Sequence, residues 1–213
     1  MTTLILASQS KGRAALLTAA GYRFSQIPSE VEEPAPGAGI PLEFHVLELA
    51  RLKAAAVARR YPNAVVIGAD TALILGRRII GKPASLAGAA RMLGQLCGHT
   101  HRISSAACVI FPTLGRNGRR RTVTVVDTAQ VRLRNWSPSR LRAFARLTRP
   151  LLWAGAYAVQ DPLSATIVER IDGDLATVVG LPLKKLEQIL SGQKTRKETI
   201  RGRKIKKKTG PRS

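Results

Sequence analysis

Short runs that are apolar, or in which apolar and polar residues alternate, lie between longer segments rich in alanine and leucine. Few folds are compatible with this order of segments. The short runs are predicted strands, at residues 3–7, 22–29, 64–76, 103–112 and 121–133. The longer segments are predicted helices, at residues 11–21, 41–60, 85–96, 138–147 and 182–190. Strands that alternate with helices of this length indicate an α/β fold, in which helices cover a sheet. The run after Gly76 is expected to return as a hairpin.

Length and charge indicate a folded body followed by a tail. With 213 residues, 45% of them hydrophobic, the chain can bury a substantial core. The formal net charge is +22, and ten Lys and Arg residues with a single Glu lie from Ser191 onward. We expect one domain over residues 1–190 and a basic, disordered tail over residues 191–213.

This charge favours polyanionic partners, because a basic surface attracts nucleotides and nucleic acids. The body without the tail still carries +13. Two interpretations of the tail stay open: a solvated extension with no specific partner, or a non-specific and salt-sensitive contact with nucleic acid. The tail has no aromatic side chain on which bases could stack, and this disfavours specific binding of single strands.

Cysteine spacing and hydropathy indicate the cellular compartment of the protein. Cys97 and Cys108 form neither a disulfide framework nor a Cys-x-x-Cys metal site, so we interpret them as thiols of a cytoplasmic protein. The N-terminal apolar run has about five residues, too few for a signal peptide or a membrane span. We therefore expect no membrane association.

The stretch GRRIIGKP, residues 76–83, resembles a phosphate-binding Walker A loop but fails its requirements. Pro83 stands where that loop needs a Ser or Thr hydroxyl for magnesium, and it has no backbone N–H to offer. The residues before Gly81 also look like a strand rather than a loop. The pattern excludes a P-loop, but it leaves Lys82 at a turn between a strand and a helix, where it can contact phosphate.

A second candidate anion site is ASQSKGR, residues 7–13. Ser8 and Ser10 lie between a predicted strand and the start of a helix, where free amides and the helix dipole favour an anion. Arg13 lies one turn further and can bind phosphate through its forked guanidinium. An ordinary serine cap with a surface arginine is the alternative.

Two charged residues fall where apolar ones are expected. Asp70 follows the apolar run AVVI, so it is expected at or near the end of a buried strand, where a carboxylate needs a hydrogen bond, a metal or a proton-transfer role. Lys53 lies on the apolar face of the helix at 41–60, which implies a buried acid or a phosphate as partner. A loop cap for Asp70 and an extended, solvent-reaching Lys53 are the alternatives.

An acidic loop supplies further carboxylates. Glu30, Glu32 and Glu33 lie within four residues in a chain that has only 13 acids. Magnesium takes few carboxylates and keeps waters and substrate phosphates, so a cluster beside a basic cleft suits it. The alternative is a solvated acidic loop.

Taken in order, these stretches resemble the Maf family of nucleoside triphosphate pyrophosphatases. The matching segments are ASQSKGR (7–13), EVEEP (30–34), LARLKA (49–54), GADT (68–71), GKP (81–83), RMLGQLCGHTH (91–101), AGAYAVQ (154–160) and VVGLPL (178–183). The resemblance implies a two-lobed α/β fold like that of inosine triphosphate pyrophosphatases, with a long mixed sheet and a deep central cleft. It also implies hydrolysis of a nucleoside triphosphate to monophosphate and pyrophosphate, a divalent cation (Mg²⁺ or Mn²⁺), a homodimer and a link to cell division.

The resemblance also implies roles for individual residues. Asp70 matches the proton acceptor, and Glu33 with Asp70 matches the carboxylates that hold the metal. The residues that match the triphosphate-binding groups are Ser8, Ser10, Arg13, Lys53 and Lys82. Arg13, Thr71 and Gln160 match the subgroup that acts on dTTP and UTP. Gln160 can read a pyrimidine edge because its amide both donates and accepts.

The chain departs from the family pattern at several positions that bear on substrate choice more than on reaction class. Gly12 replaces an arginine, and Asp174 and Thr177 change the loop near the base. Two other functions therefore stay open: a pyrophosphatase of the subgroup that acts on 7-methyl-GTP, and a Maf-like body that binds nucleic acid through its basic face. Retention of Asp70, Lys53 and Lys82 together favours an enzyme, because a binding module needs no inward carboxylate.

Overall fold

The computed structural model describes residues 3–35, 40–112 and 120–191. The basic tail from residue 192 onward lies outside the described residues. The domain boundary near residue 190 therefore stays a prediction.

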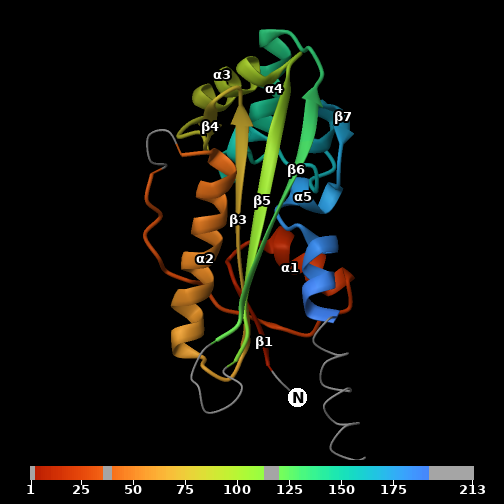
Figure 1. Ribbon diagram of the computed structural model, residues 1–213. Coiled ribbons are helices and arrows are strands. Elements are labelled where there is room, and N and C mark those ends of the chain that lie inside the picture. The colour runs from red at the N-terminus through yellow and green to blue at the C-terminus, as the bar shows by residue number, and fades with distance from the viewer. Residues whose placement is uncertain (1–2, 36–39, 113–119, 192–213) are drawn as a thin grey trace, which may run out of the picture.

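A seven-stranded mixed sheet forms the centre of the molecule (Figure 1). Its strands are β1 (Leu4–Ala7), β2 (Ser25–Gln26), β3 (Val65–Leu75), β4 (Arg78–Ile80), β5 (Thr100–Ile110), β6 (Thr122–Leu133) and β7 (Val168–Asp172). They lie in the order β2-β1-β3-β5-β6-β7, and β4 pairs with the far end of β3. The pairs β2-β1 and β1-β3 are parallel, and the remaining pairs are antiparallel. The predicted α/β class, the mixed sheet and the hairpin at Gly76 are confirmed.

Helices cover both faces of the sheet. They are α1 (Lys11–Ala19), α2 (Leu42–Arg60), α3 (Leu86–Leu96), α4 (Pro138–Leu147) and α5 (Leu175–Val179), with 3-10 turns η1 (Pro150–Leu152), η2 (Ala154–Ala156) and η3 (Ser164–Ile167). Residues 183–191 are also helical. Serine side chains cap three of these helices by accepting a backbone N–H: Ser10 for α1, Ser85 for α3 and Ser137 for α4. None of the described helices has both the length and the hydropathy required to cross a membrane.

Three buried clusters divide the core between the two ends of the sheet. At one end, α2 packs on one face through residues such as Val46 and Ala50, while α1 and residues 183–191 pack on the other face. At the far end, α3 and α4 enclose a third cluster with Leu93 and Phe144 (Figure 1). The long strands β3, β5 and β6 run through both ends and join the two lobes.

Close approach of α2 to β3 requires a glycine. A Cβ at Gly68 would overlap the backbone carbonyl of Ala50 and the backbone of Ala54 on α2. The helix therefore lies directly on the strand, and this contact brings the next turn of α2 against the residues that follow Gly68. The predicted position of Lys53 on the buried face is confirmed.

The edge of β3 is unpaired over four residues. The parallel ladder with β1 ends at the pair Ala7–Gly68, and the ladder with β4 starts at the pair Leu73–Ile80. Between them, residues 69–72 pair only with β5 among the described strands. Asp70 therefore lies in the middle of an 11-residue strand, within the predicted strand at residues 64–76, and the expectation that it lies at or near the end of a buried strand is wrong. What ends beside Asp70 is the neighbouring strand β1.

Two local predictions differ from the structure. Residues 22–29 contribute only Ser25–Gln26 to the sheet, because β2 is an edge strand that pairs with the four-residue β1 alone. The short helix α5 was not predicted. Its signals are Asp174, whose side chain accepts the Ala176 N–H, and Gly180, whose φ of +124° ends the helix.

Candidate active site

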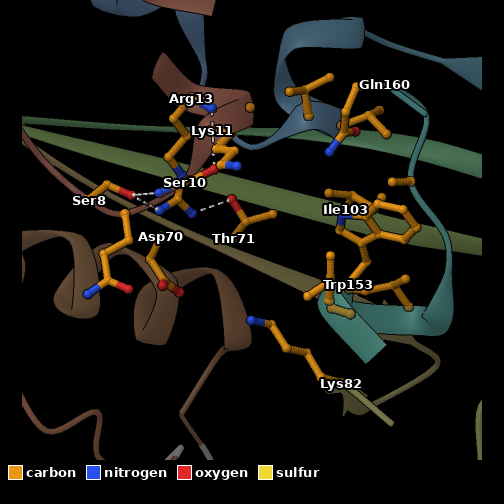
Figure 2. Close-up of a pocket in the computed structure, with 18 of the residues that line it drawn as sticks. Ser8, Ser10, Lys11, Arg13, Asp70, Thr71, Lys82, Ile103, Trp153 and Gln160 are labelled. Atoms are coloured by element: carbon orange, nitrogen blue, oxygen red, sulfur yellow. Dashed lines mark hydrogen bonds between the residues drawn. The ribbon is translucent and has the colours of Figure 1, made fainter. Parts of the chain in front are cut away.

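A cleft of about 1060 Å³ opens at the unpaired edge of β3 (Figure 2). Its walls come from the loop between β1 and α1, the segment around residues 28–33, α2, β3, the turn after β4, and residues 149–162. All nine residues to which the family resemblance gives a role line this cleft: Ser8, Ser10, Arg13, Glu33, Lys53, Asp70, Thr71, Lys82 and Gln160. Of the other two acids of the acidic loop, Glu30 lines the cleft and Glu32 is not among its lining residues. Residues far apart in the sequence therefore converge on one cleft.

The start of α1 forms one wall. Ser8 is nearly buried at the end of β1, and its hydroxyl accepts the Ser10 N–H at 3.2 Å. Ser10 caps the helix by accepting the Arg13 N–H at 3.3 Å. Lys11 and Gly12, in the first turn, also line the cleft. The positive end of the α1 dipole therefore faces the cleft, where it favours an anion.

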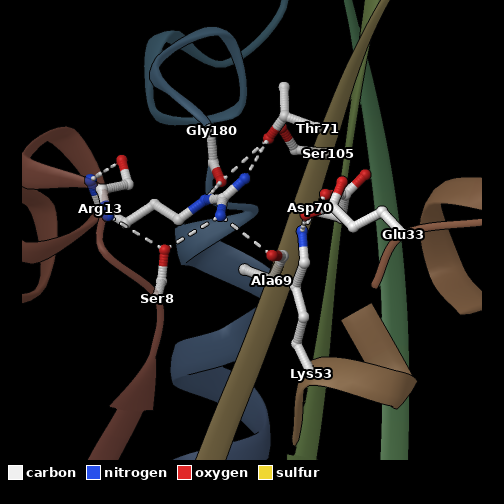
Figure 3. A network of polar contacts seen from close by, with 10 residues as sticks. Ser8, Arg13, Glu33, Lys53, Ala69, Asp70, Thr71, Ser105 and Gly180 are labelled. Carbon is white, nitrogen blue, oxygen red and sulfur yellow. Dashed lines mark hydrogen bonds and ion pairs between the residues drawn. The ribbon is translucent and has the colours of Figure 1, made fainter. Parts of the chain in front are cut away.

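Arg13 is anchored inside the protein rather than extended toward solvent (Figure 3). Its Nε donates to the Gly180 carbonyl at 2.8 Å, and its Nη1 donates to the Ala69 carbonyl at 2.9 Å and the Ser8 hydroxyl at 3.1 Å. Its Nη2 donates to the Thr71 hydroxyl at 3.0 Å. Four of the five guanidinium N–H groups are thus used within the protein. Arg13 therefore links α1, β1, β3 and the end of α5, and at most one N–H is left for a substrate.

Electrostatics at Arg13 reflect this enclosure. Burial lowers the pKa of Arg13, and the negative charges of Asp70 and Glu33 act in the opposite direction. The guanidinium stays charged, because the ordinary pKa of arginine lies far above neutrality. The alternative of a surface arginine does not describe this side chain.

Thr71 belongs to the same network. Its hydroxyl accepts from Arg13, lies 2.9 Å from the Ser105 hydroxyl and can donate to the Gly180 carbonyl at 3.2 Å. Ser105 in turn donates to the Thr177 carbonyl at 2.8 Å. Ser105 and Gly180 were not singled out from the sequence. A hydroxyl pair inside the apolar strand ISSAACVI was the available signal for Ser105.

Lys53 holds two carboxylates together on the opposite face of β3 (Figure 3). Its Nζ lies 2.6 Å from Asp70 Oδ1 and 2.7 Å from Glu33 Oε1. Lys53 is 7% exposed and Asp70 is 8% exposed, whereas the Glu33 side chain is about half exposed. A buried carboxylate requires a partner of opposite charge, and Lys53 supplies it. The predicted buried acid opposite Lys53 is thus Asp70.

The carboxylates of Asp70 and Glu33 have the donor chemistry for a divalent cation. Both carboxylates contact the same Lys53 ammonium group. The described residues contain no group of three or more His, Cys, Asp or Glu side chains placed to hold a metal. Mg²⁺ does not need such a group, since one or two carboxylates suffice when substrate phosphates and waters complete its shell.

Lys82 and Gln160 project into the cleft from the far lobe. Lys82 follows β4 and is exposed, and it makes no ion pair within the described part of the chain. Gln160 is exposed too, and its Nε2 lies 3.6 Å from where a Cβ on Gly12 would be. The same Cβ would lie 3.1 Å from Val179 Cγ1. Glycine at position 12 therefore keeps the space between α1 and Gln160 open.

The family assignment agrees with this geometry. Residues 3–193 match the family described as Maf-like protein. This chain belongs to the Maf-like family. The chain is 40% identical over 188 residues to the dTTP/UTP pyrophosphatase of Aquifex aeolicus, covering 88% of this chain and 93% of that one. It is 39% identical over 191 residues to the dTTP/UTP pyrophosphatase of Moorella thermoacetica, covering 90% and 95%.

A solved structure is also similar, at a greater distance. A HAM1 protein from Coxiella burnetii matches with a TM-score of 0.43 and 15% identity, over 90% of this chain and 100% of that one. Similarity at this level adds nothing to the functional argument.

The far wall of the Maf-like cleft was missed from the sequence. It includes Ile103, Leu152, Trp153 and Tyr157. Single apolar residues in loops and strands carry no pattern that distinguishes a cleft wall from an ordinary core position. Only the tertiary fold brings Ile103 and Trp153 opposite Ser8, Ser10 and Asp70 (Figure 2).

Proposed function

We propose that this protein hydrolyses dTTP and UTP at the α–β phosphoanhydride, releasing pyrophosphate and the nucleoside monophosphate. The observation that carries the proposal is a buried Asp70, paired with Lys53, across a cleft from the N-terminus of α1. The relatives are named dTTP/UTP pyrophosphatases, and this supports the choice of substrate.

The triphosphate would bind between α1 and Lys82. The positive dipole end of α1, the hydroxyls of Ser8 and Ser10 and the free ammonium of Lys82 offer an anion several donors from opposite walls. Such fixed donors stabilise the charge that builds up on phosphate oxygens as the bridging bond breaks. Arg13 supports this arrangement from behind by holding the Ser8 and Thr71 hydroxyls.

Asp70 would act as the general base. It takes a proton from a water molecule, whose oxygen attacks phosphorus at the α–β bridge, and pyrophosphate leaves with the electrons of the broken P–O bond. Lys53 holds the Asp70 carboxylate in place, and Glu33 shares the same ammonium. Asp70 and Glu33 would hold a divalent cation, Mg²⁺ or Mn²⁺, which supplies neutralisation of phosphate charge and orientation of the reacting groups.

Base selection would fall to Gln160 and the wall around it. Its exposed amide offers one donor and one acceptor group, as a pyrimidine edge requires. Thr71 contributes less directly, because its hydroxyl is already engaged by Arg13 and its neighbours. A pocket that prefers 7-methyl-GTP is the alternative, and the same assay distinguishes the two.

Pyrophosphate release from a nucleotide panel with Mg²⁺ or Mn²⁺ tests the proposal. We expect release from dTTP and UTP, no release after removal of divalent cations with EDTA, and a loss of at least about 100-fold in Asp70→Asn, the scale of a general base. Asp172→Asn is the matched control, since Asp172 pairs with Arg170 on the exposed strand β7. Release from 7-methyl-GTP alone would change the substrate, and release from no nucleotide would refute the enzymatic function.

Three further properties belong to the same proposal. The compartment would be a reducing cytoplasm, because Cys97 and Cys108 are buried free thiols. The oligomer would be a homodimer, which sedimentation of the purified protein tests. The tail from residue 192 would add a salt-dependent contact with nucleic acid, because of its charge.

A further inference from the structure

The aromatic side chain of Trp153 stands in the far wall of the cleft. It lies between η1 and η2 and lines the cleft together with Ile103 and Gln160. Figure 2 shows these three residues on one side of the cleft, and Ser8, Ser10 and Asp70 on the other. This wall therefore carries apolar side chains together with the exposed Gln160 amide, and the charged residues Lys82, Arg149 and Asp161 also line the cleft.

The backbone around Trp153 is firmly held. The Trp153 N–H donates to the Pro150 carbonyl at 3.3 Å, and the Trp153 carbonyl accepts from Ala156 at 3.1 Å. The Gly155 N–H donates to the Gly81 carbonyl at 3.0 Å, next to Lys82. One backbone hydrogen bond therefore connects the segment that carries Trp153 to the turn that carries Lys82. The backbone that carries the indole therefore does not need to be ordered when a ligand binds.

The indole itself is unused by the described part of the protein. Trp153 is only partly buried, and neither an aromatic partner, a stacked cation nor an acceptor for its Nε1–H occurs among the described residues. The other tryptophan contrasts with it: Trp136 stacks under Arg140 at 3.8 Å and packs edge-to-face against Phe144. Partly exposed tryptophan with an unused ring is an unusual feature inside a polar cleft.

The neighbouring aromatic residue cannot take the same role. Tyr157 also lines the cleft, but it is 4% exposed and its hydroxyl lies 2.7 Å from His101 Nε2. Among the described aromatic residues of the cleft, Trp153 is therefore the one that offers a ring surface to a ligand. Gln160, on the same side of the cleft (Figure 2), offers hydrogen bonds at the edge of such a ligand.

We propose that Trp153 is the platform on which the nucleobase of the substrate stacks, while Gln160 contacts the base edge. This inference rests on the proposed function, since it places the base of the same nucleotide whose triphosphate faces α1. Stacking tolerates any base, because every base has a π face. Trp153 would therefore contribute affinity for the nucleoside part, and Gln160 would contribute the choice between bases.

Kinetics with and without a base test this platform. In Trp153→Ala we expect kcat/KM for dTTP to fall about 10- to 100-fold, the range seen when a base-stacking aromatic is removed. Trp153→Phe, which keeps a ring, should retain most of the activity, and Trp153→Leu should not. The inhibition constant of inorganic tripolyphosphate, which has no base, should stay within twofold in all three variants. Trp136→Phe is the control outside the cleft.

Fluorescence provides a readout that does not depend on turnover. In a Trp136→Phe background, Trp153 is the remaining tryptophan, and dTMP should quench its emission whereas inorganic pyrophosphate should not. The platform would be overturned if Trp153→Ala weakened tripolyphosphate inhibition by the same factor as it lowered kcat/KM for dTTP. It would also be overturned if dTMP left the Trp153 emission unchanged. Quenching by dTMP in a protein that hydrolyses no nucleotide would overturn the proposed reaction and leave the platform standing.

Discussion

Replacing Arg13 by methionine removes the guanidinium but keeps a side chain of similar length. Four hydrogen bonds are lost, to Gly180, Ala69, Ser8 and Thr71. The two hydroxyls keep other partners, because Ser8 still accepts from the Ser10 N–H and Thr71 still meets Ser105. The Ala69 carbonyl loses the partner that Arg13 provides at the unpaired edge of β3.

The magnitude follows from these contacts. A lost hydrogen bond costs about 1 kcal/mol net, and a buried acceptor left without a partner costs about 1–3 kcal/mol. We therefore expect Arg13→Met to lower the free energy of unfolding by about 3 kcal/mol. For a domain of this size, about 2–4 °C are lost per kcal/mol, so Tm should fall by about 6–12 °C. Catalytic efficiency should fall as well, since Ser8 and Thr71 lose their support.

Two measurements check this expectation: Tm from thermal unfolding followed by circular dichroism, and KM for dTTP. Lys82→Met is the matched control, because Lys82 is an exposed cation of the same cleft. It should raise KM while leaving Tm within about 2 °C, as surface substitutions do. Arg13→Lys should have an intermediate Tm and remain measurable if Arg13→Met does not fold. An Arg13→Met protein that melts like Lys82→Met and differs only in KM would refute the structural role.

Three other perturbations have defined outcomes. Gly155→Ala should lower the free energy of unfolding by about 2–3 kcal/mol, because Gly155 has a φ of +72° and a Cβ there would overlap Leu73. A Cβ at Gly81 would meet open space, so Gly81→Ala should leave thermal unfolding unchanged. Burial lowers the pKa of His101 to about 4, so as the pH falls the unfolded chain binds the proton before the folded protein does. The contribution of His101 to the free energy of unfolding should therefore be constant above pH 6.5 and fall by up to about 3 kcal/mol as the pH drops from 6.5 toward 4. Urea melts of wild type and His101→Gln should therefore differ more at pH 7 than at pH 4.5, and a difference independent of pH would contradict this. Truncation after Leu190 should leave turnover unchanged and reduce salt-dependent binding to DNA, and lost turnover would show that the tail is needed by the fold.

The predictable part of the site depended on residues that violate local patterns. Lys53 stood on the apolar face of a helix, and its position implied a buried acid or a phosphate as partner; in the structure the partner is the buried acid Asp70. The serine cap of α1 was readable from the two serines before the helix, and Ser10 provides it. The anion-binding role of the same serines stays a prediction. Short-range sequence rules are sufficient where a role is determined within one turn of a helix.

The unpredicted part depends on contacts between distant segments. Arg13 carried no local sign that it would bind a carbonyl 167 residues away, so it was interpreted as a phosphate ligand. Asp70 was expected at or near the end of a strand although the strand predicted at residues 64–76 extends beyond it. What ends near Asp70 is the pairing of β3 with β1, and strand pairing cannot be read from one strand. Trp153 lies in a loop with no periodic pattern, so its place in the cleft follows only from the packing of η1 and η2.

The cleft exists because β1 is short. Were the ladder between β1 and β3 to continue past Ala7 and Gly68, a neighbouring backbone would occupy the edge from which Ala69 meets Arg13. A mutational scan that changes one side chain at a time would not detect this requirement, because the requirement concerns the length of β1 and not the identity of any side chain. Insertions of two residues after Ala7 should therefore inactivate a protein that retains every side chain of the site. Among related sequences, an insertion at the end of β1 should therefore mark loss of the active site as clearly as a substitution of Asp70 does.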